Sequence, residues 1–350
     1  MTERRNFAAR LLAWFGANRR DLPWRATRDP WAIWVSEVML QQTRVAAVRA
    51  AYERFLLRFP TAASFAAASD DDLLLAWRGL GYYRRARLLR EGARAVVARH
   101  GGAVPADPAA LGELPGVGDY TRGAVASIAF GVAEPAVDGN VERVIARHRG
   151  VREDVKSAPA RQRIHGAVQR WLDVRRPGDF NQALMELGAL VCTPTAPACD
   201  RCPVAIDCEA AARGLTAELP VRRTPRQSVE VCARVGLATR AGAVLAVRVP
   251  DGEPNAGQVE LPGAGILQSL EAGDLGRTLH TRFGARADVG DVLASVRHAI
   301  THHRITLHAH AIAVRDPGRL AWFPIGESTP WTTASRKVFG AALGVRAMRT

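Results

Sequence analysis

Apolar residues recur at helical spacing through the first two hundred positions of the chain. Phe7, Leu11, Leu12 and Phe15 fall on one side of a helix over residues 7–15. Asp29-Pro30 predicts a second helix, because aspartate caps helix starts and proline suits the first turn. The same spacing predicts helices from Thr43 and over 70–78, 83–99, 120–130, 139–148, 158–174 and 178–190. Strand-like alternation is nearly absent before residue 228, which predicts an all-helical first part.

The pattern changes in the last third of the chain. Residues 229–238, 243–249 and 303–314 are rich in Val, Leu and Ala and alternate as strands do. The stretch from Glu218 to Arg226 is polar and basic and contains two prolines, so we interpret it as a linker. We therefore expect a helical domain over 1–217, a linker over 218–228, and a small α+β domain over 229–350.

The charge of the chain indicates a class of binding partner. The chain of 350 residues has a net charge of +14, and residues 1–100 contain 18 Arg against 9 Asp and Glu. Such an excess favours a polyanion, usually DNA or RNA. The arginines of one predicted helix either face DNA or form a solvated surface, and both interpretations stay open: 84, 85, 87, 90, 94 and 99.

Nothing in the sequence indicates a membrane protein. No uninterrupted apolar run approaches the length that spans a bilayer. The charged residues at the start precede no apolar core of a signal peptide. We expect a cytoplasmic monomer.

Four of the five cysteines lie between residues 192 and 208. Cys192, Cys199, Cys202 and Cys208 are separated by six, two and five residues. A reducing cytosol disfavours disulfides, so the compact set indicates a metal or cluster site. Zinc and a four-iron cluster both accept four thiolates, and the spacing chemistry alone leaves both open.

Two glycines mark a turn between two predicted helices, in Leu114-Pro115-Gly116-Val117-Gly118. Asp107-Pro108 begins the first helix, and Asp119 is expected to cap the second. Glycines let the backbone approach a ligand closely, and N–H groups at a helix start bind anions. The turn therefore suits a DNA phosphate, with an ordinary helix–helix connection as the alternative.

Glu37 lies among apolar residues of its predicted helix, including Val35 and Val38. Burial disfavours the ionised form and raises a carboxyl pKa, which suits a general acid. The alternative is a glutamate on the solvated side of the helix.

Five segments occur in an order that resembles one enzyme family: residues 36–43 (SEVMLQQT), 79–83 (GLGYY), 114–118 (LPGVG), 137–141 (VDGNV) and the cysteine set. Together they resemble the MutY-type adenine DNA glycosylases of the helix-hairpin-helix superfamily that includes endonuclease III. The resemblance is strong over residues 5–215. It implies a helix-hairpin-helix near 107–131, a four-iron, four-sulfur cluster in loop 192–208, and double-stranded DNA carrying adenine opposite 8-oxoguanine or guanine as the partner.

The resemblance also assigns roles to single residues. Glu37 matches the family's catalytic acid, and Asp138 matches the carboxylate that stabilises positive charge on the sugar. Tyr120 stands where strand-cleaving relatives carry a Schiff-base lysine, which implies a monofunctional glycosylase. The remaining matches are expected to contact DNA or the adenine: Arg20, Trp24, Arg25, Gln42, Tyr82, Gly116, Gly118 and Asn140.

The family ends in a Nudix-like domain, and a degenerate Nudix frame follows Gly263. The positions where active Nudix enzymes place magnesium-binding glutamates are occupied by other residues, so we expect this domain to be catalytically inactive: Ser269, Thr278, Thr281 and Arg282. The lesion-reading triplet of the family, Phe-Ser-His, here reads Ile300-Thr301-His302. Thr301 and His302 are expected to contact the lesion, and the lost aromatic leaves the strength of 8-oxoguanine preference open.

Overall fold

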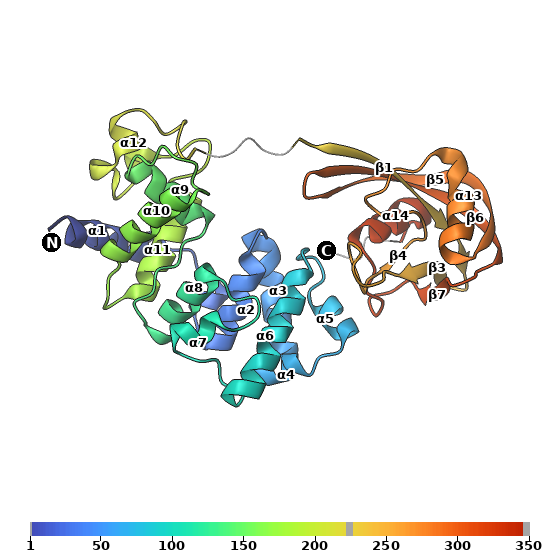
Figure 1. The fold of residues 1–350 in the computed structure, drawn as a ribbon, viewed down its shortest axis with the longest axis horizontal. Helices are drawn as coiled ribbons and strands as arrows, with labels where there is room; N and C mark the ends of the chain where they lie inside the picture. The colour runs from blue at the N-terminus through green and yellow to red at the C-terminus, as the bar shows by residue number, and fades with distance from the viewer. Residues whose placement is uncertain (1, 222–226, 346–350) are drawn as a thin grey trace. The chain divides into compact units, whose positions relative to one another are not determined.

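The computed structural model describes residues 2–221 and 227–345 (Figure 1). They divide into two compact units, one within 1–67 and 84–224 and the other within 68–83 and 225–350. Part of the predicted linker, residues 222–226, lies outside the described residues, and the predicted domain boundaries stay a prediction.

Helices form the first unit, as its apolar spacing predicts. The first group comprises α1 (Thr2–Asn18), η1 (Pro23–Arg25), α2 (Pro30–Leu40), α3 (Val45–Arg58), α4 (Ala62–Ala66), α6 (Arg84–His100), α7 (Pro108–Gly112) and α8 (Asp119–Phe130). Then follow α9 (Gly139–His148), α10 (Ala158–Trp171), α11 (Pro177–Leu190), η2 (Cys199–Arg201), η3 (Ala205–Asp207) and α12 (Glu209–Ala212). The short helix α5 (Asp70–Ala76) belongs to the residues grouped with the second unit.

Helix α2 begins where the sequence predicts. The carboxylate of Asp29 accepts hydrogen bonds from the N–H groups of Trp31 and Ala32, and Pro30 occupies the first turn. Every residue from Trp31 to Met39 is buried, so α2 crosses the interior of the unit. A glutamate in this helix is therefore carried into an apolar environment.

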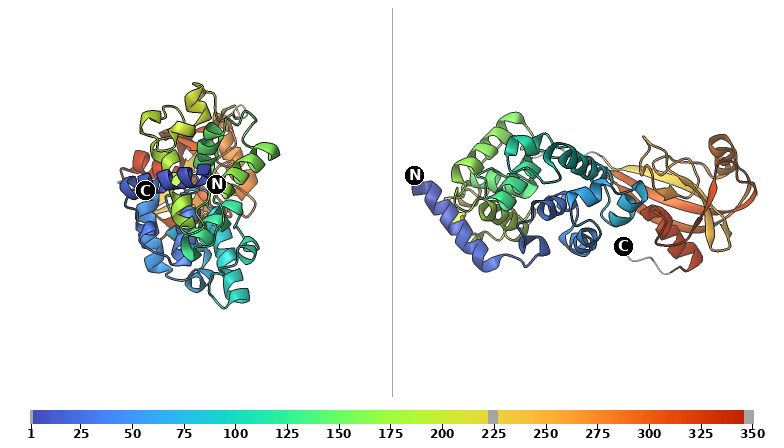
Figure 2. Two further views of the ribbon diagram at one scale, coloured as in Figure 1. Left: turned by 90° about the vertical axis from the view of Figure 1, so that its left-hand side faces the viewer. Right: turned by 90° about the horizontal axis from the view of Figure 1, so that it is seen from below.

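Two groups of helices have separate cores. Phe7 of α1 stacks on Trp171 of α10 at 4.2 Å between ring centroids, and Leu184 of α11 belongs to the same core. The other group is aromatic, with Trp31 and Phe55 packed around Phe65. Figure 2 shows α1, in dark blue, at the edge of the group that it forms with α10 and α11.

The turn before α8 differs from the expectation in one residue. Gly118 is the N-cap of α8, with φ −93° and ψ 179°. Asp119, expected to be the cap, is the first helical residue, and its carboxylate pairs with Arg122 at 3.0 Å. The hairpin itself is present as predicted, with α7 capped by Asp107.

Several arginines of α6 have structural partners within the unit. The guanidinium of Arg85 donates to the carbonyls of Val38 (2.7 Å) and Met39 (3.1 Å), which lie at the end of α2. Arg94 donates to the carbonyl of Ala66 at 3.1 Å, and Arg90 is buried. Arg85 and Arg94 therefore tie α6 to its neighbours. Arg84, Arg94 and Arg99 are exposed, and for them both interpretations, a DNA-facing row and a solvated surface, stay predictions.

The second unit is an α+β structure. Its elements are β1 (Val229–Leu237), β2 (Thr239–Arg240), β3 (Ala243–Arg248), β4 (Val259–Glu260), η4 (Ala272–Asp274), α13 (Leu275–Phe283), β5 (Arg286–Ile300), β6 (His303–Asp316), β7 (Ala321–Pro324) and α14 (Thr333–Leu343). One sheet has the order β1-β6-β5, with β1 parallel and β5 antiparallel to β6. In the other sheet, β3 pairs antiparallel with β2, β4 and β7.

Alternation along β6 divides this unit into two cores. Ile305 and Leu307 pack with Phe339 of α14, whereas Ile312 packs with Leu279 of α13. Successive side chains of a strand point to opposite faces, so β6 has a helix on each side. The sequence analysis did not predict β5, and none of its residues is fully buried. Its partly buried side chains Val289, Val296 and Ile300 pack against the two cores.

The predicted combination of a helical part and an α+β part is confirmed, and the Nudix-like assignment stays a prediction. Among the described residues, no helix is both long and apolar enough to cross a membrane.

Gly123 of α8 provides a test of the packing in the first unit. A Cβ at this position would lie 2.0 Å from the carbonyl oxygen of Pro135, which is backbone and cannot rotate away. Gly123→Ala is expected to lower the free energy of unfolding by about 1–3 kcal/mol. Thermal unfolding measures the change.

The matched control is Gly166→Ala in α10, where a Cβ would meet nothing within 4 Å. Alanine is the better helix former by about 1 kcal/mol, so the control is expected to be neutral or stabilising. Equal midpoints for the two variants would contradict the close packing at Gly123.

Candidate active site

A cleft of about 880 Å³ lies in the first unit. Its walls come from η1, the end of α2 and the turn that follows, the hairpin before α8, the start of α9, and α11. Nine of the residues predicted for the site line it: Arg20, Trp24, Arg25, Glu37, Gln42, Gly116, Gly118, Tyr120 and Asp138. A tenth, Asn140, lines it from the first turn of α9.

Glu37 is the buried acid of the cleft, with 4% of its surface exposed. Burial is the main cause that raises the pKa of its carboxyl to about 7. The hydrogen bond from Tyr120 lowers this pKa, the charge of Asp138 raises it further, and the charge of Arg25 lowers it. A pKa near neutrality gives a carboxyl that holds a proton and can release it.

Tyr120 lies in the first turn of α8, directly against Glu37. Its hydroxyl donates to the Glu37 carboxylate and also contacts the sulfur of Met185 at 3.3 Å. Burial and the neighbouring carboxylates of Glu37 and Asp138 raise the pKa of Tyr120 well above its usual value. The phenol therefore keeps its proton and acts as a hydrogen-bond donor.

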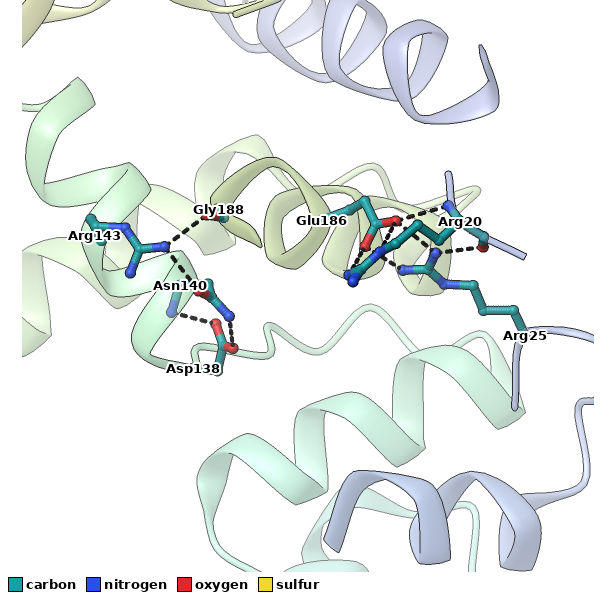
Figure 3. Close-up of polar contacts among 7 residues, drawn as sticks. All are labelled: Arg20, Arg25, Asp138, Asn140, Arg143, Glu186 and Gly188. Carbon is teal, nitrogen blue, oxygen red and sulfur yellow. Dashed lines mark hydrogen bonds and ion pairs between the residues drawn. The ribbon is translucent and has the colours of Figure 1, made fainter. Parts of the chain in front are cut away.

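Asp138 is the N-cap of α9, and both oxygens of its carboxylate accept hydrogen bonds. One oxygen accepts from the backbone N–H groups of Asn140 (2.9 Å) and Val141 (2.8 Å), and the other accepts from the Asn140 side-chain amide (2.9 Å) (Figure 3). Burial raises the pKa of Asp138, and these donors together with Arg143 act against the rise.

Arg143 fixes Asn140 from the next turn of α9. Its guanidinium donates to the side-chain oxygen of Asn140 at 2.9 Å and to the carbonyl of Gly188 at 2.7 Å (Figure 3). It also donates to the carbonyl of Cys192 at 2.7 Å. The carboxylate of Asp138 is thus connected through two side chains to the start of the cysteine loop.

Sequence reasoning missed one carboxylate in the wall of the cleft, Glu186 of α11. It accepts hydrogen bonds from Arg20 and Arg25, which approach from the segment after α1 (Figure 3). The apolar neighbours Leu184 and Leu187 are the same sequence signal that made burial one of the two interpretations for Glu37.

Lys156 is a second residue that sequence reasoning left out of the site. It lines the same cleft and pairs with Glu142 at 2.7 Å. Trp24 lines the cleft, as expected, and it is also buried against Tyr52, with ring centroids 5.6 Å apart. Gly116 has φ +79°, and a Cβ there would lie 2.8 Å from the Cβ of Leu88, so glycine is required.

Three predicted DNA contacts belong to the second unit as it is grouped. Tyr82 is 47% exposed and has φ 46°. Thr301 and His302 form the turn between β5 and β6, where Thr301 has φ 53° and its hydroxyl lies 3.3 Å from Nδ1 of His302.

The four clustered cysteines line one small cavity in the first unit, together with Arg147 and His148. Burial and the neighbouring sulfurs raise the pKa of the Cys202 thiol to about 11, against a hydrogen bond from the backbone of Val204. Arg147 donates to the sulfur of Cys192 at 3.4 Å. Within residues 2–221 and 227–345, no group of three or more His, Cys, Asp or Glu is spaced to hold a single metal ion.

Comparison with known proteins gives the class of the helical unit that holds this hairpin, cleft and buried acid. The family described as "HhH-GPD superfamily base excision DNA repair protein" matches residues 35–170. A thermostable thymine-DNA glycosylase is 30% identical, with a TM-score of 0.56, over 61% of this chain and 98% of that structure. The chain belongs to the HhH-GPD superfamily.

Adenine DNA glycosylases are among its relatives. The human protein is 49% identical over 216 residues, which are 59% of this chain and 40% of that protein. The protein of Mycobacterium tuberculosis is 47% identical over 196 residues, 55% of this chain and 64% of that protein. The matches therefore span less than two thirds of the relatives' own length.

The contact between Tyr120 and Glu37 gives a prediction that is independent of catalysis. A donor to the ionised carboxylate lowers its pKa, so Tyr120→Phe is expected to raise the pKa of Glu37 above about 7. Titration of ¹³C-labelled glutamate by NMR measures the shift, and Glu37→Gln identifies the resonance. A lower or unchanged pKa in Tyr120→Phe would contradict the donor role of the phenol.

Proposed function

We propose that this protein is a monofunctional DNA glycosylase of base excision repair, which removes adenine mispaired with 8-oxoguanine or guanine. The observation that carries the proposal is Glu37, a buried carboxyl with a pKa of about 7 in the same cleft as Asp138. Glu37 accepts a hydrogen bond from Tyr120, whereas Asp138 accepts three from Asn140 and Val141. Two carboxyl groups in such different environments suit a division into a general acid and a stabiliser of positive charge. The similarity to the adenine DNA glycosylases supports adenine as the base.

The reaction needs a base outside the duplex, because a stacked adenine is beyond the reach of any side chain. The 880 Å³ cleft has room for a flipped nucleotide, and the hairpin glycines Gly116 and Gly118 at its rim suit a backbone phosphate. Gln42 and Tyr82 are proposed to lie beside the gap that the adenine leaves.

In the proposed reaction, Glu37 donates its proton to N7 of adenine. The proton makes the base a better leaving group, and the bond between N9 and the sugar C1′ then breaks with its electron pair going to the base. Positive charge develops on the sugar, and Asp138 stabilises it electrostatically. Water then adds to C1′ and loses a proton, which leaves the abasic sugar. Asn140 and Arg143 hold that carboxylate in place, so little reorganisation is needed when the charge forms.

Tyr120 in place of a lysine supports glycosylase activity without strand cleavage. The described part of the cleft does contain a lysine, Lys156, and its ammonium pairs with Glu142 through contacts of 2.7 and 2.8 Å. Both contacts hold the amine of Lys156 on the Glu142 carboxylate, so Lys156 is assigned no covalent step.

The four cysteines are proposed to hold a four-iron, four-sulfur cluster. Their thiols surround a shared cavity instead of closing on one point, which suits a group larger than one ion. Backbone N–H groups of Ala210 and Ala211 directed at Cys208, and the guanidinium of Arg147 at Cys192, are donors of the kind that stabilise thiolate ligands.

The second unit is proposed to read the base opposite adenine through Thr301 and His302. The left-handed backbone of Thr301 places both side chains in the tight turn between the two longest strands. Nudix-type hydrolysis is not expected of this unit. The guanidinium of Arg282 donates to the carbonyl of Gly263 and pairs with Glu253, so a fixed cation lies where an active Nudix frame would bind magnesium.

A gel assay on defined duplexes tests the proposed function. The protein is expected to excise adenine opposite 8-oxoguanine or guanine, and to leave adenine opposite thymine intact. The strand should break only after alkali, because a monofunctional enzyme leaves the sugar in place. Excision of thymine from a mispair with guanine, or strand cleavage without alkali, would contradict the proposal.

The cluster assignment predicts a coloured protein. Protein purified without oxygen is expected to absorb broadly near 400 nm (roughly, as thiolate–iron charge transfer does) and to contain iron and sulfide. Cys199→Ser is expected to lower the iron content, whereas Cys232→Ser, outside the set, should leave it unchanged. A colourless protein with stoichiometric zinc would contradict the assignment.

A further inference from the structure

Two arginines converge on the single buried carboxylate of Glu186 (Figure 3). Arg20 donates its backbone N–H (2.8 Å) and Nε (3.0 Å) to one oxygen and a terminal nitrogen (2.6 Å) to the other. Arg25 donates one terminal nitrogen to each oxygen at 3.0 Å. Arg25 also donates to the carbonyl of Arg20 at 2.9 Å, so the two arginines and Glu186 form one unit.

The carboxylate at the centre is almost inaccessible, with 1% of the Glu186 side chain exposed. Burial alone would raise its pKa, but the hydrogen bonds from Arg20 and Arg25 outweigh burial and lower the pKa of Glu186 to about 2. Glu186 is therefore ionised throughout the working pH range. Two guanidinium groups and one carboxylate leave a net charge of one positive unit in this wall of the cleft.

This positive charge affects the pKa of Glu37, which lines the same cleft. After burial, the Tyr120 hydrogen bond and the Asp138 charge, Arg25 is the remaining influence on Glu37, and it favours the ionised form. The ionisable groups that line the cleft with Glu37 are Arg20, Arg25, Asp119, Tyr120, Asp138, Arg143, Lys156 and Glu186. Of the carboxylates among them, Glu186 is the one bonded to Arg25.

We propose that Glu186 is a positioning residue, which fixes Arg20 and Arg25 in the wall of the cleft and balances their charge beside Glu37. The placement of the two arginines by Glu186 rests on the hydrogen bonds among the three residues. The expected effect on excision rests on the proposed function. Without the carboxylate, the wall would carry two positive charges. They would favour ionised Glu37, and the proton needed by the leaving base would be lost at a lower pH.

The test substitutes Glu186→Gln, which keeps the size and removes the charge. The pKa of Glu37, followed by ¹³C NMR, is expected to fall by about one unit. In single-turnover excision of adenine opposite 8-oxoguanine, the high-pH limb should shift down by the same amount. The rate would then fall about tenfold at pH 8.5 and stay nearly unchanged at pH 5.

Three further variants separate charge from structure. Arg25→Gln removes the positive charge and is expected to shift the pKa of Glu37 upward, opposite to Glu186→Gln. Glu186→Asp keeps the charge and should restore most of the profile. The matched control is Glu134→Gln, which breaks a glutamate–arginine pair with Arg122 outside the cleft lining and should leave the profile unchanged.

The outcomes distinguish this inference from the proposed function. If wild type excises adenine but Glu186→Gln loses activity equally at every pH, with no shift in the Glu37 titration, the residue is merely structural and the inference is wrong. If Glu186→Gln fails to fold, an absent or downward shift in Arg25→Gln overturns it. If wild type excises nothing while the predicted titration shifts are found, the arrangement holds and the proposed function fails.

Discussion

The arrangement of the helical unit depends on the burial of one carboxyl group, Glu37. Moving a carboxylate from water into an apolar interior is costly unless it is neutralised or paired, and here the cost appears as a raised pKa. Helix α2 carries the residue inside because its whole central stretch is buried. The hydrogen bond from Tyr120 limits the rise in the pKa of Glu37. Glu37 can therefore both hold and release its proton near neutral pH.

The surrounding helices keep the other charges at fixed positions relative to that proton. Asp138 is held as the N-cap of α9, and Arg143 connects the Asn140 amide to the carbonyl of Cys192. Arg147, one turn later, contacts the Cys192 sulfur and the carbonyls of Thr193 and Pro194. The loop of cysteines and the start of α9 are therefore tied together by two neighbouring arginines.

Sequence reasoning recovered the features that local chemistry determines. Asp29-Pro30 marked the start of α2, and the apolar spacing marked most helices of the first unit. The apolar neighbours of Glu37 left its burial as one of two interpretations, and the family resemblance singled it out. It failed where partners lie far apart in the sequence. The pairing of Glu186 with Arg20 spans 166 residues. Arg85 looked like a surface residue because its carbonyl partners, more than forty residues away, are invisible in a helical pattern.

The most direct test of the account compares Glu37→Gln with wild type. The substitution keeps the size of the side chain and removes the proton donor, and general acid catalysis contributes about 10²–10⁴-fold. Single-turnover excision of adenine opposite 8-oxoguanine is expected to be abolished, while the affinity for the same duplex at fixed salt stays nearly unchanged, because phosphate contacts dominate binding. Excision within a few-fold of wild type, or a collapse of binding, would contradict the assignment of Glu37 as the acid.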